Sequence, residues 1–205
     1  MSEKIIEINN LLYDSSFSKK IKIDDEFNSS FESGISIENL NEEEEEEEEE
    51  IISEEKKQIS KSISTILNEL IEISKKQNNE NEKDIFDTNS IPNITLYDYI
   101  IRIISYSNCE ENTLISALIY IDWIAQKKKI TNLNVYKLVF TSILISLKYN
   151  EDQIYQNDYY SQIAGVSICE LNKMEYEFFI LVNYNLYINE SIFKQYKYAL
   201  QKMNE

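Results

Sequence analysis

The sequence predicts an all-α protein, and two observations lead to that class. Only 2 glycines and 1 proline occur among 205 residues, whereas β folds rich in turns need many more of both. Apolar residues recur every three or four positions through most of the chain after residue 57, which is the spacing of one helix face. About 100–150 residues are enough for a stable core, so the chain has room for one domain and a tail.

The N-terminal residues 1–55 are expected to form a disordered acidic region. Residues 42–50 are an unbroken run of glutamate, and residues 1–90 hold 25 acidic and 10 basic residues against 12 and 10 in the remainder. Such a segment buries too little apolar surface to fold alone. The alternative is an acidic docking tail for a basic partner. Because this charge repels phosphate, nucleic acid is not an expected partner.

The folded domain is expected to span residues 56–205 and to begin with an amphipathic helix over residues 57–76. Residues 77–90 are polar and predict a linker. A second helix follows Pro92 and ends near Tyr106. Asn108, with a glutamate three residues later, predicts the N-cap of a third helix that runs to about residue 126.

The next predicted helix, residues 134–149, is apolar nearly all round and is therefore expected at the centre of a bundle. A short element over residues 158–164 stops at Gly165. Ser167 and Glu170 form a capping box for a helix to about residue 183, and a last helix covers residues 191–203. The prediction is a core of the first five helices that follow Pro92. The helix over residues 134–149 is the third of these five and lies in the centre, and an N-terminal and a C-terminal helix flank the core.

Composition argues against catalysis. The chain has no histidine, which removes the commonest general base and metal ligand. Two glycines cannot build a Gly-rich phosphate loop, and the two cysteines lack zinc spacing. We therefore expect no enzyme, no cofactor and no metal site. Cys109 and Cys169 read as free thiols in a reducing compartment rather than as a disulfide.

The chain also lacks the sequence features of membrane and secreted proteins. It contains no apolar run of about 18 residues or more, so no membrane span is expected. Its first residues lack the apolar core and cleavage site of a signal peptide. An intracellular location, cytoplasmic and/or nuclear, is expected.

Four charged residues stand in strongly apolar sequence, where a charge is costly unless it has a partner. Lys148 ends the most apolar helix, and Glu175 lies within an apolar stripe. They are expected to pair with each other or with the backbone of another protein. The alternative is a lysine that stabilises a helix C-terminus and a glutamate at the edge of its stripe. Arg102 and Asp122 are expected to form a buried structural ion pair between their two helices.

Several segments resemble the cyclin box, and in particular the P/U-type cyclins. Tyr120-Ile-Asp122 resembles the family's Tyr-Leu-Asp, and residues 145–149, Ile-Ser-Leu-Lys-Tyr, resemble its Ala-Ser-Lys-Phe. Residues 157–172 are similar to the segment most distinctive of this subgroup, and Leu171-Asn-Lys-Met-Glu175 resembles its Leu-Asn-x-x-Glu. The resemblance covers residues 59–200 and implies a single cyclin box.

The resemblance implies a non-catalytic regulatory subunit that binds and activates a cyclin-dependent protein kinase as a heterodimer. In that family the residues at the positions of Lys148 and Glu175 hold the backbone of the kinase C-helix. Arg102 and Asp122 match residues that usually join the first two helices of the cyclin box. The alternative function is a helical scaffold or adaptor without a kinase. Four apolar residues are expected to add contact area to the kinase-binding site: Leu147, Leu171, Met174 and Phe178.

Overall fold

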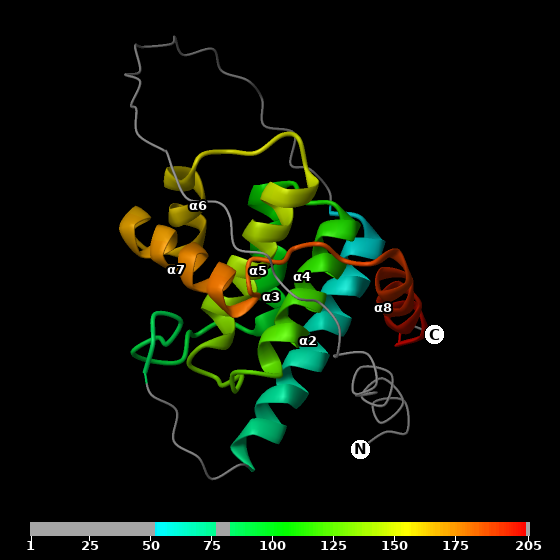
Figure 1. Ribbon diagram of the computed structural model, residues 1–205, viewed down its shortest axis with the longest axis horizontal. Helices are drawn as coiled ribbons and strands as arrows, with labels where there is room; N and C mark the ends of the chain where they lie inside the picture. The colour runs from blue at the N-terminus through cyan, green and yellow to red at the C-terminus, as the bar shows by residue number, and fades with distance from the viewer. Residues whose placement is uncertain (1–51, 77–82, 204–205) are drawn as a thin grey trace. The chain divides into compact units, whose positions relative to one another are not determined.

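The computed structural model describes residues 52–76 and 83–203 (Figure 1). The expectation of a disordered acidic tail falls almost entirely on residues 1–51, which lie outside the described residues. The described ranges contain helices and no strand, so the predicted all-α class is confirmed. No helix among these residues is long and apolar enough to cross a membrane. The helices are α2 (Glu54–Lys75), α3 (Leu96–Ser107), α4 (Glu111–Ala125), α5 (Val135–Asn150), α6 (Asn157–Ala164), α7 (Ile168–Leu181) and α8 (Glu190–Met203).

Helix α5 lies at the centre of the described domain, as its apolar sequence predicts. Every residue from 135 to 147 except Lys137 is buried. The helix packs against α3, α4, α6 and α7. In Figure 1, α6 and α7 lie on one side of the α4–α5 pair, and α2 and α8 lie on the other. This arrangement gives the predicted five-helix core, α3 to α7, with the flanking helices α2 and α8.

Helix α2 begins two residues before the expected start of the folded domain. The Ser53 side chain accepts a hydrogen bond from the Lys56 backbone N–H at 3.2 Å and caps the helix. Two glutamates, Glu54 and Glu55, occupy the first turn, where negative charge interacts favourably with the helix dipole. These acidic residues therefore belong to the helix, although their composition resembles that of the preceding tail.

The predicted N-cap at Asn108 is wrong. Asn108 instead ends α3 in the left-handed conformation, with φ of 47°, which asparagine adopts more readily than most residues. The N-cap of α4 is Glu110, whose side chain makes no capping bond. The Glu151 carboxylate replaces it, accepting from the Glu110 N–H at 2.9 Å and the Thr113 hydroxyl at 2.5 Å. A residue 41 positions away thus caps α4.

The predicted linker is anchored where the structure describes it, from residue 83 onward. Phe86 is buried in the core. The Lys137 ammonium donates to the backbone carbonyls of Ile85 and Asp87, at 3.0 and 3.3 Å. The polar sequence of this segment did not indicate the anchor. A single aromatic side chain is buried, and the hydrogen bonds are accepted by backbone oxygens, which every residue has.

The predicted ion pair between Arg102 and Asp122 does not form. Both residues are described, and no ion pair or hydrogen bond joins them. Arg102 is exposed. Asp122 is buried and accepts from the Tyr196 hydroxyl at 2.9 Å and from the Gln126 amide at 3.4 Å. The buried carboxylate is therefore satisfied by a neutral donor from α8, which fastens the C-terminal helix to α4.

This contact predicts which of two substitutions destabilises the fold. Tyr196→Phe should lower the free energy of unfolding by about 1–3 kcal/mol, because it removes a donor from a buried carboxylate. Arg102→Ala should change it by less than about 0.5 kcal/mol, as is usual for an exposed side chain. Urea unfolding of both variants measures the difference. A large loss of stability in Arg102→Ala would indicate that Arg102 does pair with Asp122, and it would contradict the contact described above.

The burial of Asp122 also predicts how the stability of the fold depends on pH. Burial raises the pKa of this carboxyl above its ordinary value, and the hydrogen bonds from Tyr196 and Gln126 offset part of that rise. The folded state then holds the proton more tightly than the unfolded state, so this group contributes less stability as the pH rises above about 4. Asp122→Asn keeps an acceptor oxygen and cannot ionise. Its stability relative to the wild type should rise between about pH 4 and pH 7. Unfolding of both proteins at several pH values checks this, and a difference in stability that stays constant with pH would contradict it.

Candidate functional site

The C-terminal end of α5 and the middle of α7 are held together by the way the chain turns between them. Gly165 ends α6 with φ of 69°, a conformation that costs little only without a Cβ. The Ser167 hydroxyl then accepts from the Glu170 N–H at 3.1 Å and starts α7, as the capping box predicts. The Glu170 carboxylate pairs with Lys137 of α5 at 2.8 Å. These contacts fix α7 beside α5.

Lys148 and Glu175 meet at this junction. The Lys148 ammonium lies 2.6 Å from Glu175 Oε1, and the two side chains are 26% and 12% exposed. Asn157, the first residue of α6, lies between them. Its Oδ1 accepts from Lys148 at 2.5 Å, and its Nδ2 donates to Glu175 Oε2 at 2.5 Å and to Asn172 Oδ1 at 2.7 Å. We call these four residues the polar network.

The polar network retains hydrogen-bonding capacity toward the solvent. An ammonium group has three donors, and Glu175 and Asn157 accept two of those of Lys148. Each oxygen of Glu175 accepts one bond in the network and can accept another. The pair can therefore donate to a carbonyl oxygen and accept from an N–H group. Those are the groups that a polypeptide backbone presents.

Comparison with known proteins decides the family. A family model described as Cyclin matches residues 35–186, which is more than half of the chain. This chain belongs to the cyclin family. The five-helix core, α3 to α7, lies within the matched residues, which also take in α2, and α8 follows the match. At the level of the family, a cyclin is a regulatory protein and not a catalyst.

Similar curated proteins place the chain among the P/U-type cyclins. It is 31% identical to Cyclin-U2-1 of Arabidopsis thaliana over 151 residues, which are 68% of each protein. It is 36% identical to Cyclin-U2-2 of the same plant over 121 residues, 58% of this chain and 53% of that protein. It is 28% identical to Cyclin-P3-1 of Oryza sativa subsp. japonica over 120 residues, 58% of this chain and 51% of that protein. The last two matches span about half the length of the relatives.

The four apolar residues expected to touch a partner are core residues of this cyclin. Each has a relative exposure of 0%, so none offers surface to another protein, and that part of the expected site is corrected. The apolar stripe of α7 is the face that packs against the rest of its own box. An apolar stripe indicates burial but does not say which molecule buries it. The residues are Leu147, Leu171, Met174 and Phe178.

A different apolar stripe of α7 is exposed, and sequence reasoning missed it. Ile168, Tyr176 and Ile180 are among the exposed large apolar residues of the cyclin box. With Asn172 of the polar network they recur every fourth position, so they share one face of the helix. Tyr149, next to Lys148, is 53% exposed. The recurrence of these residues at every fourth position was the available sequence signal. It was weaker than the helical spacing of the buried apolar residues on the same helix.

The end of α7 adds an aromatic element to this exposed face. Asn183 and Tyr184 both have φ of 55°. The Tyr184 N–H donates to the Phe179 carbonyl at 2.7 Å and the Asn183 N–H to that of Ile180 at 3.0 Å, which is the Schellman pattern. The Tyr184 ring stacks on Phe179, with centroids 6.3 Å apart and planes at 9°. A residue other than glycine rarely keeps such a conformation, so the turn holds this aromatic pair in a defined place.

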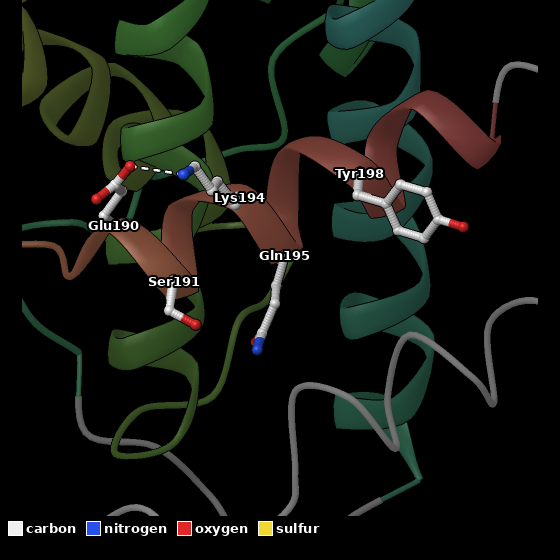
Figure 2. A pocket seen from close by; sticks show the side chains of 5 residues that line it. All are labelled: Glu190, Ser191, Lys194, Gln195 and Tyr198. Carbon is white, nitrogen blue, oxygen red and sulfur yellow. Dashed lines mark ion pairs between the residues drawn. The ribbon is translucent and has the colours of Figure 1, made fainter.

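Other surfaces of the described domain carry less chemistry. Figure 2 shows the side chains of a hollow on α8, in which Glu190 and Lys194 point toward each other while Ser191, Gln195 and Tyr198 point away from them. Its ion pair, Glu190 with Lys194 at 2.6 Å, is largely exposed. Burial raises the pKa of Cys109 to about 12, which makes it a poor nucleophile. No cluster of potential metal ligands occurs among the described residues.

The corrected positions predict a contrast in stability. Leu171→Ala should lower the free energy of unfolding by about 2–5 kcal/mol, because it opens a cavity in the core. Tyr176→Ala, on the opposite exposed face of the same helix, should change it by about 0.5 kcal/mol or less. Chemical denaturation measures both. Equal losses in the two variants would mean that α7 packs in a different rotation from the one described.

Proposed function

We propose that this cyclin binds and activates a cyclin-dependent protein kinase, and that Lys148 and Glu175 form the polar centre of the interface. The observation that carries the proposal is their ion pair at the junction of α5 and α7, partly exposed and with bonding capacity to spare. A pair satisfied wholly within the fold would leave no such capacity. The resemblance of residues 145–149 and 171–175 to the kinase-binding segments of cyclins supports the same assignment.

The exposed apolar residues supply the contact area that the polar pair lacks. Tyr149 follows Lys148, and Tyr176 follows Glu175 and lies four residues after Asn172. Interfaces are enriched in tyrosine because its ring buries a large area with few rotatable bonds. A kinase helix laid across α5 and α7 would cover these rings and desolvate the ion pair. These residues replace the four buried ones in the proposed interface.

The proposed mechanism is conformational. Lys148 donates to backbone carbonyls and Glu175 accepts from backbone N–H groups at the kinase C-helix, which holds that helix against the kinase active site. An inward C-helix brings the kinase glutamate to the lysine that orients ATP. The cyclin contributes binding energy that favours the active state, and all phosphoryl transfer belongs to the kinase. Such a partner implies a cytoplasmic or nuclear location.

The proposal predicts that Lys148→Ala and Glu175→Ala each weaken kinase binding by about 2 kcal/mol or more, because each leaves a desolvated charge without its partner. Kinase activation should fall in step. The measurement is a calorimetric titration of the cyclin against a panel of purified cyclin-dependent kinases, with a thermal melt of each variant beside it. Melting should change little, because Asn157 remains a hydrogen-bond partner for whichever charge is left.

Matched controls come from the same helix. Lys173→Ala and Glu177→Ala remove the same charges from exposed positions of α7 and should bind as the wild type does. If all four variants bind equally well, the interface lies elsewhere. If the wild type binds no kinase of the panel, the chain is a scaffold or adaptor, and the proposed function fails.

A further inference from the structure

Asn157 touches every other member of the polar network. Its side chain bonds to Lys148 of α5 and to Glu175 and Asn172 of α7. Asparagine at a helix start usually caps its own helix. Here the N-cap of α6 is Gln156, whose side chain makes no capping bond, and the amide of Asn157 points to the other two helices. Its bonds therefore serve the network rather than α6.

The amide group matches the two charges between which it lies. The lysine needs an acceptor and the carboxylate needs a donor, and a carboxamide presents one of each on neighbouring atoms. Both N–H groups of Asn157 are used, one by Glu175 and one by Asn172. Neither carboxylate nor alkyl groups can make this set of bonds. The position is therefore specific for an amide, and the amide has no donor left for a partner.

We propose that Asn157 is a positioning residue, which holds Lys148 and Glu175 in their partner-binding geometry before the partner arrives. The inference rests on the proposed function, because the partner is the kinase of the preceding section. A free lysine side chain samples many rotamers and loses them on binding. With two of its donors already bound, Lys148 has lost much of that freedom in the free cyclin. Pre-organisation of this kind strengthens binding without adding a contact.

The first test uses the free chain of all 205 residues. Nitrogen-15 relaxation of the Asn157 side-chain amide should show it to be as rigid as the helix backbone. The Lys148 ammonium, assigned by its loss in Lys148→Ala, should be similarly restrained. Asn157→Ala should make this ammonium mobile, whereas Asn93→Ala, at an exposed site before α3, should not. An ammonium equally restrained in Asn157→Ala overturns the inference.

The second test measures binding to the kinase that the wild type binds most tightly in the panel. Asn157→Ala should weaken binding roughly tenfold, the effect expected for hydrogen bonds to charged groups. Asn172→Ala, which removes one neutral acceptor, should have a smaller effect. The Asn93→Ala control should bind as the wild type does.

Asn157→Asp separates positioning from mere space filling. The introduced carboxyl would accept from Lys148 but would face Glu175 as a second carboxylate. Lys148 from α5 and Glu175 from α7 are the charges that face position 157, and Asp158 on α6 is exposed. The amide donor to Glu175 would be replaced by a repelling carboxylate oxygen. Asn157→Asp should therefore weaken binding more than Asn157→Ala does.

The outcomes distinguish this inference from the proposed function. If Lys148→Ala loses binding and Asn157→Ala does not, the site stands and the positioning role is wrong. If Asn157→Asp and Asn157→Ala show the same deficit, the amide donor has no role and the inference is also overturned. If the wild type binds no kinase, the proposed function fails, and the relaxation measurement alone decides whether Asn157 restrains Lys148.

Discussion

The burial of α5 is the constraint on which the rest of the domain depends. A helix that is apolar on nearly every side cannot lie at a surface, so other helices must cover it completely. Helices α3, α4, α6 and α7 do so. Covering the middle of a 16-residue helix on all sides leaves its two end turns as the places where a charged side chain can emerge. Lys137 stands in the first turn and Lys148 in the last. The same burial that builds the core therefore decides where the lysine of the proposed interface appears.

Asp122 shows how much of a buried charge sequence can predict. Its apolar neighbours indicated correctly that the carboxylate is buried and requires a partner. They did not identify the partner, because Tyr196 lies 74 residues away on a helix whose packing depends on the whole fold. A positively charged residue was the natural expectation, but a tyrosine hydroxyl satisfies a buried carboxylate without the cost of burying a second charge. The partner of a buried charge is thus a property of the tertiary structure.

The candidate site, too, could be predicted only in part from the sequence. The pairing of Lys148 with Glu175 could be foreseen, because each was an exception within an apolar pattern. The roles of Leu171 and Met174 could not, because an apolar helix position looks the same whether its own domain or a partner covers it. Asn157 gave no signal of its own, since an asparagine at a helix start suggests a cap. Only the arrangement of α5, α6 and α7 around it shows that its amide joins two charges.

The cap on α4 has a consequence for the lifetime of the site. The last turn of a helix is ordinarily the first part to unravel, and Lys148 lies in such a turn. Three residues later, Glu151 is bound to the start of α4 through the Glu110 N–H and the Thr113 hydroxyl. The end of α5 therefore cannot unwind without also releasing the start of its neighbour. Local unfolding at this point is therefore coupled between two helices, and the bonds of Glu151 oppose fraying of the turn that holds the lysine.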